Sequence, residues 1–273
     1  MELIIDNLTY QKNDVIILKN ISHKFKKGIT SIIGETGSGK TTLFELIDYL
    51  DKPTSGSITA CDITINNKKK INVNKLRINI GFLFQNKENT FFSKTVFDEI
   101  KFSLKHFKIS GDYLQKAKDL LDLVNLDYSY LSLNPFNLSL GEKTKVALAV
   151  ILATDPKILL LDEPTIGLDG KNINMLINLL KKIKKDKIII INSNDISFIS
   201  KISDEIIVLK KGAIIAKDKK EKILKNEKIL IENNIIIPPI IEFINYTKKT
   251  KKIFLKPTLN IKKLSKDIIK NVK

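Results

Sequence analysis

The hydrophobic positions of this chain follow two different periods. Short apolar runs alternate with turns over residues 1–33 and again over 57–84, a pattern typical of β-strands. From about residue 86 to 155 the apolar side chains recur with a helical period, and a helix is expected at KTKVALAVILAT (143–154). The pattern therefore predicts two strand-rich segments separated by helices.

The second half of the chain alternates strands and helices. The runs KILLLDEP (157–164) and DKIIIINS (186–193) are apolar at successive positions, which predicts strands buried on both faces. INMLINLLKKIKK (173–185) between them predicts a helix, and DEIIVLKKGAII (204–215) predicts a final pair of strands. This alternation favours a parallel sheet covered on both faces, with the helices of 86–155 inserted between two parts of it.

The C-terminal tail has a different composition. Residues 216–273 are rich in lysine, and their helical spacing is broken at Pro238-Pro239. We therefore expect one domain over residues 1–215, followed by a small C-terminal module over 216–273.

The composition narrows the class of protein. A single cysteine excludes an internal disulfide framework. No apolar run approaches the ~18–20 residues of a membrane span, and the N-terminus lacks a secretory signal, so we expect a cytosolic protein that can dock on a membrane partner. The net charge is +17, but the lysines are dispersed without interleaved aromatic residues and Arg77 is the only arginine, so no nucleic-acid partner is expected.

GETGSGKT (34–41) matches the phosphate-binding pattern G-x-x-x-x-G-K-[ST] at every position. It follows the apolar run TSIIG and precedes LFELIDYL (43–50), whose spacing predicts a helix, so it has the strand–loop–helix context that confirms such a loop. The loop's N–H groups surround phosphate oxygens, Lys40 supplies a positive charge and Thr41 a hydroxyl ligand for Mg²⁺. The expected nucleotide-binding residues are Gly34, Glu35, Thr36, Gly37, Ser38, Gly39, Lys40, Thr41 and Thr42.

A second motif ends the strand of KILLLDEP. Asp162 is placed to hold the Mg²⁺ shell, and Glu163 beside it can polarise a water for attack on the γ-phosphate. Phosphoryl transfer mainly requires positioning and charge neutralisation, so a base next to the metal site fits this chemistry. Together with the phosphate loop, these residues predict an ATPase that uses ATP and Mg²⁺.

The order of motifs resembles that of the ATP-binding cassette (ABC) ATPases over residues 1 to about 215. LSLGEK (138–143) is similar to the family signature LSGGQ, IGLD (166–169) resembles the D-loop, and Gln85 lies where the family has its Q-loop glutamine. The resemblance implies an α/β P-loop NTPase fold of the ABC type. Its expected parts are a RecA-like parallel sheet core, an N-terminal antiparallel β part and an inserted helical subdomain at about 86–155. It also implies that Gln85 binds the nucleotide and ligates Mg²⁺.

ABC ATPases work as dimers, which implies that a second chain supplies half of each ATP site. The signature of one subunit covers the ATP held by the P-loop of the other. Ser139, Gly141 and Glu142 are therefore expected to contact the partner's nucleotide.

A finer resemblance is to the ATPases of energy-coupling factor (ECF) transporters, and among them to the second of two paralogous A components. It rests on FQNKENTFFSKTVFDEIKFSLKHF (84–107), on the stretch from NPFNLSLGEK to the D-loop, and on ENNIIIPPIIEF (232–243) in the tail. It implies a peripheral subunit at the cytoplasmic face of the cell membrane, which couples ATP binding and hydrolysis to uptake of a vitamin or metal ion. The implied partners are a second ABC ATPase subunit in a heterodimer, a transmembrane T component and a substrate-binding membrane S component. The tail would be a dimerisation module.

The signature departs from the family pattern at two positions. Leu140 replaces a glycine, which matters if the position needs a left-handed backbone. Glu142 replaces the usual glutamine, and its carboxylate repels phosphate. We therefore expect a weakened contact with the partner's ATP.

Two further departures concern the chain's own nucleotide. The family's adenine-stacking aromatic residue aligns with Lys12, and Tyr10 is either its substitute or a core tyrosine. The family's switch histidine aligns with Asn194, whose amide donates hydrogen bonds but exchanges no proton near neutral pH. We expect Asn194 to act as a catalytic residue beside Glu163, with slow hydrolysis at this subunit's own P-loop site.

Other functions are compatible with part of this pattern. The chain could be the ATPase of another ABC transporter, or a degenerate, mainly structural ATP-binding subunit, which Leu140 and Asn194 favour and Glu163 opposes. A DNA-repair ABC ATPase needs a longer insertion than residues 43–137 provide, and a ribosome-associated one usually has two cassettes rather than one.

Overall fold

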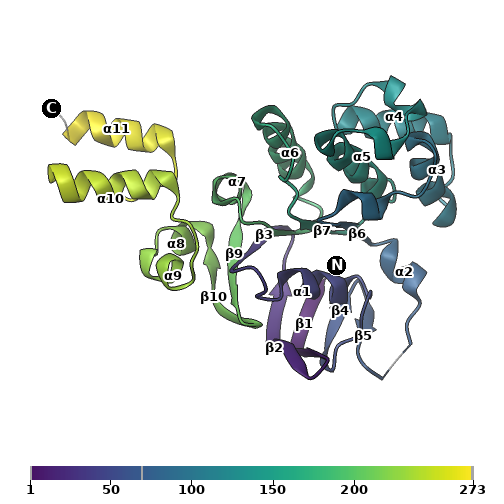
Figure 1. The fold of residues 1–273 in the computed structure, drawn as a ribbon, viewed down its shortest axis with the longest axis horizontal. Helices are drawn as coiled ribbons and strands as arrows, with labels where there is room; N and C mark the ends of the chain where they lie inside the picture. Colours follow the sequence, from purple (N-terminus) through teal and green to yellow (C-terminus); the bar gives the residue numbers. More distant parts are fainter. Residues whose placement is uncertain (1, 69, 272–273) are drawn as a thin grey trace.

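The computed structural model describes residues 2–68 and 70–271, and its centre is a six-stranded sheet in the order β10-β9-β3-β8-β7-β6 (Figure 1). Within this sheet every neighbouring pair is parallel except β9 and β10. The predicted parallel core is therefore confirmed. Its strands are β3 (Gly28–Ile33), β6 (Ile80–Leu83), β7 (Ile158–Asp162), β8 (Ile188–Asn192), β9 (Glu205–Lys210) and β10 (Ala213–Lys219).

The four isoleucines of β8 are explained by the two layers that cover this sheet. Ile188 and Ile190 pack into the core on the side of the N-terminal strands, and Ile189 and Ile191 pack into the core on the side of the helices. All four are at most 1% exposed. Because successive side chains of a strand point to opposite faces, a strand at the centre of three layers must be apolar at every position.

The N-terminal part forms a four-stranded antiparallel sheet in the order β2-β1-β4-β5, as expected. Together with helix α1 (Lys40–Ile47) it packs against one face of the main sheet (Figure 1). Its burial there supplies one of the two cores that enclose β8. Its strands are β1 (Leu3–Lys12), β2 (Val15–Phe25), β4 (Ser55–Ala60) and β5 (Ile63–Ile65).

One short helix, α2 (Val73–Arg77), lies within 57–84, where we predicted strands throughout. The side chain of Asn72 accepts a hydrogen bond from the N–H of Lys75 at the start of this helix. Such a cap stabilises the helix end locally. The helix has no recognisable apolar periodicity, because Leu76 is its only buried side chain. The prediction was wrong at this point for that reason.

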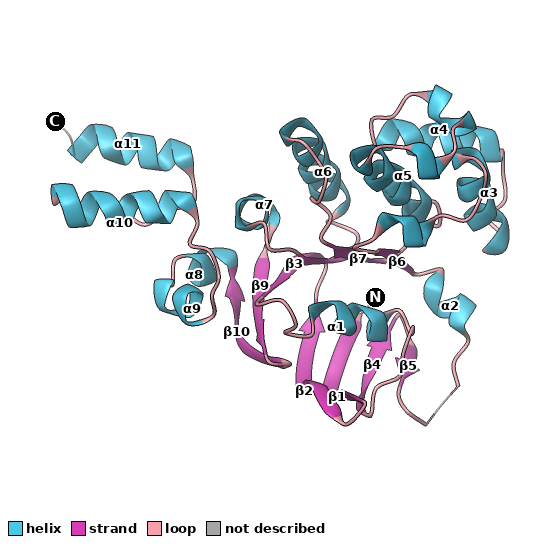
Figure 2. Ribbon diagram, viewed as in Figure 1, coloured by secondary structure: helices cyan, strands magenta, loops and turns pink. Residues whose placement is uncertain are grey.

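The opposite face of the main sheet is covered by helices (Figure 2). The predicted helical insertion is confirmed: three helices stand at one end of the sheet, with one 3₁₀ turn before the first and two between the second and the third (Figure 1). None of the helices in the described ranges is both long and apolar enough to cross a membrane. This layer comprises α3 (Val96–His106), α4 (Tyr113–Leu123), α5 (Leu140–Leu152), α6 (Gly170–Ile183) and α7 (Ile196–Ile202), with the turns η1 (Lys87–Thr90), η2 (Tyr128–Ser132) and η3 (Pro135–Asn137).

The main domain extends beyond residue 215. β10 continues to Lys219, and the short helices α8 (Lys220–Leu224) and α9 (Glu227–Glu232) follow it. Ile223 and Leu230 of these helices are buried in the core of the main domain. The first part of the expected C-terminal module therefore packs as part of the ATPase body.

The last two helices form a hairpin that projects from the body (Figures 1 and 2). α10 (Pro239–Lys251) and α11 (Ile261–Asn271) share a hydrophobic cluster of their own. Its buried members are Ile241, Ile244, Leu255 and Leu264. Separate packing thus begins near Pro238, later in the chain than residue 216.

The turn between β9 and β10 supports the phosphate-binding loop. Lys211 (φ 45°) and Gly212 (φ 78°) both lie in the left-handed region, as a tight two-residue hairpin turn requires. The N–H of Gly212 donates to the carbonyl of Ser38 at 3.1 Å. A Cβ at Gly212 would lie 2.1 Å from the carbonyl oxygen of Ile17. This glycine therefore allows β2, the hairpin and the loop to approach one another.

We expect Gly212→Ala to destabilise the chain by about 2 kcal/mol or more, because it combines a left-handed alanine with a backbone clash. Thermal unfolding would register this as a fall of roughly 4 °C or more in the midpoint. Gly170→Ala is the matched control, since a Cβ at that position meets no atom within 4 Å. Equal midpoints for the two variants would contradict this account of Gly212.

Candidate active site

The phosphate-binding loop joins β3 to α1. Gly39 (φ 101°) ends the loop and α1 begins at Lys40, earlier than the 43–50 expected from the apolar spacing, because the polar Lys40 and Thr41 already belong to the helix. A Cβ at Gly34 would lie 2.0 Å from the carbonyl oxygen of Leu209, so only glycine fits against β9 there. The unpaired N–H groups of the first turn of α1 make this end of the helix a site for a phosphate anion.

The ammonium group of Lys40 lies at the centre of this loop. Its Nζ donates to the carbonyl oxygens of Gly34 at 2.7 Å and Glu35 at 2.9 Å, and the residue is buried. Burial lowers the pKa of Lys40, while the nearby Glu163 and Asp162 carboxylates oppose that shift. The loop therefore holds a desolvated positive charge where phosphate oxygens would bind.

Asp162 ends β7 and is held on both carboxylate oxygens. Thr41 Oγ1 donates to Oδ2 at 2.9 Å, and the side-chain amide of Asn192 donates to Oδ1. Burial raises the pKa of Asp162, and these two hydrogen bonds act in the opposite direction by favouring the ionised form. Thr41 and Asp162, which we expected separately to serve Mg²⁺, are thus in direct contact.

Glu163 is held in a defined orientation by the segment after β8. Ser193 Oγ donates to its carboxylate at 3.2 Å, and the backbone N–H of Asn194 donates at 3.1 Å. Its backbone is left-handed (φ 45°), an uncommon conformation for a non-glycine residue. Burial raises the pKa of Glu163, a shift in the direction that suits a group accepting a proton from water.

The chain therefore brings together site residues from four strand ends. One cavity of about 370 Å³, here called the P-loop cavity, lies at the carboxyl edge of the main sheet. Gln85 reaches it from the end of β6, and Asn194 from the end of β8. Its lining residues are Ile17, Thr36, Gly37, Gly39, Lys40, Thr41, Thr42, Gln85, Glu163, Asn192 and Asn194.

Tyr10 is not among the residues that line this cavity. It is buried in the core of the antiparallel sheet, and its hydroxyl donates to the carboxylate of Asp51. Burial raises its pKa to about 12. Ile17 of β2 lines the cavity instead. The structure therefore favours the core-tyrosine alternative over adenine stacking for Tyr10.

Two residues at the site were missed in the sequence. Lys87 is 1% exposed, and its ammonium donates to the carbonyls of Phe84 at 2.6 Å, Asp162 at 3.1 Å and Glu163 at 3.5 Å. Burial lowers its pKa to about 8. Asn192, the other residue, lies beside Asp162. Lys87 could not be recognised in the sequence, because it is one of many lysines. Asn192 could have been recognised, because a polar residue directly after four isoleucines is unusual.

The signature lies in a separate cavity of about 530 Å³, here called the signature cavity. Ser139 caps α5: its Oγ accepts from the N–H of Glu142, and the Glu142 carboxylate accepts from both the N–H and the Oγ of Ser139. Tyr130 also donates to Glu142, and these hydrogen bonds lower the pKa of its carboxyl. The Ser139 hydroxyl is therefore engaged by a neighbouring negative charge.

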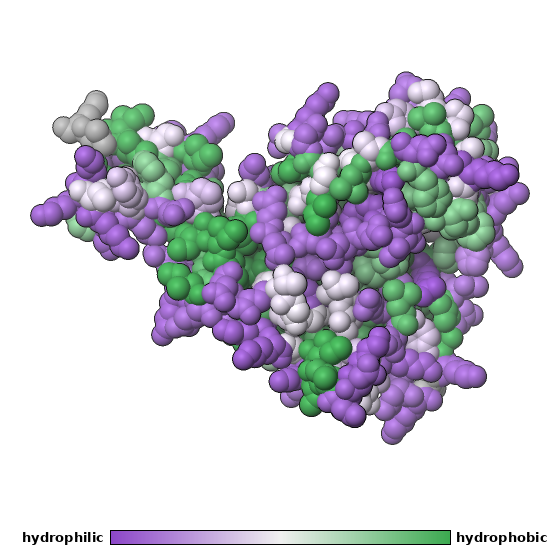
Figure 3. Space-filling model, viewed as in Figure 1, coloured by the Kyte–Doolittle hydropathy of each residue, from purple (hydrophilic) through white to green (hydrophobic). Residues whose placement is uncertain are grey.

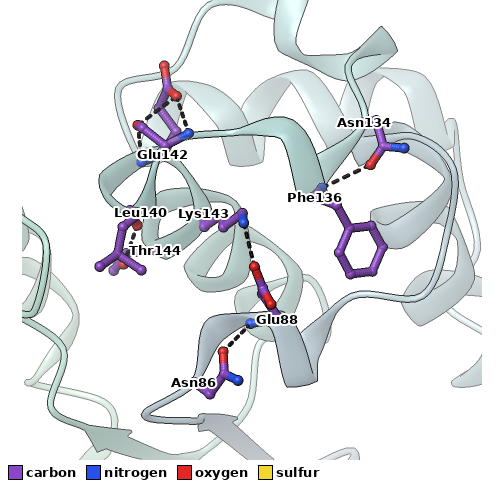
Figure 4. Close-up of polar contacts among 9 residues, drawn as sticks. Asn86, Glu88, Asn134, Phe136, Leu140, Glu142, Lys143 and Thr144 are labelled. Atoms are coloured by element: carbon purple, nitrogen blue, oxygen red, sulfur yellow. Dashed lines mark hydrogen bonds and ion pairs between the residues drawn. The ribbon is translucent and has the colours of Figure 1, made fainter.

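The start of α5 is also tied to the segment after Gln85 (Figure 4). Lys143 Nζ lies 2.6 Å from a carboxylate oxygen of Glu88 in η1, on a different side of the helix from Glu142. Leu140 begins the helix and has no left-handed φ, so a Cβ at this position creates no backbone strain. Its side chain lies against Gly167 of the D-loop segment, where an added Cβ would come within 2.4 Å of it.

Comparison with known proteins agrees with this arrangement. The sequence profile of the ABC transporter family matches residues 18–166, more than half of the chain. Two curated relatives are the energy-coupling factor transporter ATP-binding proteins EcfA3 of Oenococcus oeni and EcfA2 of Staphylococcus aureus. They are 37% and 35% identical over 250 and 255 residues, covering 89% of this chain and 87% and 88% of the relatives.

A solved structure with the same fold is the dimeric, post-hydrolysis state of the ATP-binding cassette MJ0796 bound to ADP and Pi. It superposes with a TM-score of 0.73 at 29% identity, over 80% of this chain and 98% of that one. The fold, the family profile and the relatives all agree with the motifs gathered at the two cavities. The chain therefore belongs to the ABC transporter family and is an ATP-binding ATPase subunit of the energy-coupling factor type.

Proposed function

We propose that this chain binds and hydrolyses MgATP as one subunit of an ECF importer that takes up a vitamin or a metal ion through membrane partners. The observation that carries the proposal is the P-loop cavity, where Lys40 and Thr41 meet Glu163, Gln85 and Asn194. These groups come from separate strands and match the needs of phosphoryl transfer: phosphate binding, a general base and polar groups around the reacting water.

The residues at this cavity fit a magnesium ion. Thr41 and Gln85 line it, and both also line a neighbouring cavity together with Asp162, whose carboxylate contacts the Thr41 hydroxyl, so hard oxygen ligands converge there. No group of three His, Cys, Asp or Glu side chains that could hold a metal by itself occurs over residues 2–68 and 70–271. This suits Mg²⁺, which protein sites usually hold through one or two side chains plus substrate phosphates. When bound, the ion would neutralise charge on the β- and γ-phosphates.

Glu163 acts as the general base in this proposal. The hydroxyl of Ser193 and the N–H of Asn194 fix its carboxylate, and Lys87 fixes its backbone through the carbonyl of Glu163. The base is thus oriented before substrate binds, which is how general-base catalysis gains most. The amide of Asn194 can donate to the γ-phosphate or to water but cannot exchange a proton, so hydrolysis at this site is slow.

The signature cavity serves the ATP of a second ATPase subunit. It shares no lining residue with the P-loop cavity, so one chain presents two half-sites. Glu142 holds the Ser139 hydroxyl and adds a negative charge where a partner's γ-phosphate would approach. The departures at Asn194 and at Leu140 and Glu142 support a heterodimer, with a partner that keeps the usual residues.

Membrane partners dock on the helical subdomain in this proposal. The apolar side chains of Phe92, Phe102, Leu133 and Phe136 are each at least 41% exposed there. Phe92 and Phe102 stack edge to face. Exposed apolar patches of this kind mark protein contacts, and we assign this one to the T component. The S component would capture the substrate.

The C-terminal hairpin is the proposed dimerisation module. Phe243, Tyr246 and Phe254 of this segment are 45%, 60% and 69% exposed. Figure 3 shows apolar surface on the hairpin and at its junction with the body. Because the hairpin buries only a small cluster of its own, apolar side chains remain for a second subunit.

Vesicles test the import function. We expect a complex of this chain with its second ATPase, T and S components to accumulate substrate only when ATP is supplied on the side of the ATPases.

If the partner's own catalytic glutamate is replaced, the residual ATP turnover belongs to this chain, and Glu163→Gln should lower it about 100-fold or more. Glu221→Gln, remote from both cavities, is the control. Residual turnover that is absent, or unchanged by Glu163→Gln, would favour a mainly structural subunit.

Asn194→His should raise turnover at this chain's site by about tenfold or more, because a lost transition-state contact typically costs about 10²–10³-fold. The backbone N–H that holds Glu163 is retained in this variant. Turnover is measured in the same background, with the partner's glutamate replaced. No gain would refute the idea that Asn194 limits hydrolysis.

Glu142→Gln should tighten ATP binding at the partner's P-loop. Removing one negative charge near a phosphate is worth about 1 kcal/mol in a water-exposed site, so the KM for ATP at that site should fall roughly three- to tenfold. The difference should shrink at high salt, since exposed charges are screened. A KM that does not change at low salt would show that Glu142 does not face the nucleotide.

A further inference from the structure

Asn192 is the last residue of β8 and is buried beside Asp162. The two residues pair in register, Asn192 is 3% exposed, and its carbonyl accepts from the N–H of Glu163 at 2.8 Å. All other residues of β8 are isoleucines that pack into the two cores. An amide therefore interrupts an apolar strand at the point where the strand reaches the P-loop cavity.

The orientation of this amide is fixed by its neighbour. Its nitrogen donates to Oδ1 of Asp162, whose other oxygen accepts from Thr41 at 2.9 Å. An ionised carboxylate offers only acceptors, so it must face the amide nitrogen, and the amide oxygen must face another direction.

The amide oxygen of Asn192 is buried, and among the described residues no protein donor lies within hydrogen-bonding distance of it. The two buried ammonium groups whose charges act on Asp162 donate to other groups: Lys40 to two loop carbonyls and Lys87 to three carbonyls. A buried acceptor without a donor is unfavourable, so a donor is expected to come with the substrate complex.

We infer that Asn192 accepts a hydrogen bond from a water molecule bound to Mg²⁺ in the MgATP complex, and so is a positioning residue for the metal. This rests on the magnesium site of the proposed function. Mg²⁺ dehydrates reluctantly and keeps several waters in nucleotide sites, and water polarised by a cation is a strong donor. Asn192 thus serves the ion twice: its nitrogen orients the Asp162 carboxylate and its oxygen receives the hydration shell.

Three variants of the full chain separate this role from packing. Asn192→Val removes both polar atoms and suits an apolar strand. Asn192→Asp keeps an oxygen and adds a negative charge. Ile190→Val is the control, since this residue packs in the core of the same strand. The probe is a fluorescent, non-hydrolysable ATP analogue, titrated once in Mg²⁺ and once in EDTA. The quantity compared among the variants is the affinity in Mg²⁺ divided by the affinity in EDTA, called the ratio below.

We expect the ratio to fall about tenfold in Asn192→Val, because outer-shell partners typically change metal affinity by about 10- to 100-fold. The affinity in EDTA should stay within about twofold of wild type, since no metal is involved there. In Asn192→Asp the ratio should rise. A second carboxylate weakens binding of the metal-free analogue because it repels the phosphates, and it strengthens binding of the Mg²⁺ complex because it attracts the cation. The affinity of the analogue complex for Mn²⁺, from the electron paramagnetic resonance signal of free Mn²⁺, should follow the same order.

Equal losses in Mg²⁺ and in EDTA, or an unchanged ratio in Asn192→Val, would show that the amide only supports packing and would overturn the inference. A ratio below wild type in Asn192→Asp would also overturn it, and this variant decides the question if Asn192→Val does not fold. A wild-type ratio of one would reject the proposed magnesium site itself, and the inference with it.

Discussion

The pairing of β8 with β3 on one side and β7 on the other determines the geometry of the site. Ile188 to Ile191 alternate between two hydrophobic cores, and each buried side chain of this size contributes roughly 1.5–3 kcal/mol. Because a slip of one residue would still leave isoleucines facing both cores, the register is specified at the ends of this run, where Lys187 donates to Asp155 and Asn192 donates to Asp162. That register places Asn192 beside Asp162 and the following residues at Glu163. Apolar burial therefore holds the strand at the centre of the molecule, and the polar contacts at its two ends align the site.

The structure brings together the predicted site residues that belong to short, consecutive sequence motifs. The phosphate loop and the Asp162-Glu163 pair are short motifs, and each needs only its own strand and turn to be recognised. The parallel sheet followed from runs that are apolar at every position, because only a strand covered on both faces has that pattern. The assignments of Gln85 and Asn194 depended on family resemblance, since a single polar residue at a strand end has no distinctive spacing.

Other features depended on contacts between distant segments. Lys87 is held by three carbonyls where β6 and β7 end, and a lysine at that position looks like any other in a lysine-rich chain. Tyr10 was ambiguous because β1 carries register shifts on either side of it, so counting residues from a neighbouring motif does not give the direction of its side chain. The end of the main domain was misplaced since α8 and α9 are short, and only tertiary contacts attach them to the main core.

The separation of the two cavities has a consequence for how subunits combine. Asn194 lines the P-loop cavity, which binds this chain's own ATP in the proposed function, whereas Leu140 and Glu142 line the signature cavity, which the proposal offers to another chain. Two copies of this chain would concentrate every departure in each of two identical ATP sites. A pairing with a different subunit would instead distribute them, one kind to each site, so that neither site combines an altered switch with an altered signature. The choice of partner would then determine how many altered residues surround each bound ATP.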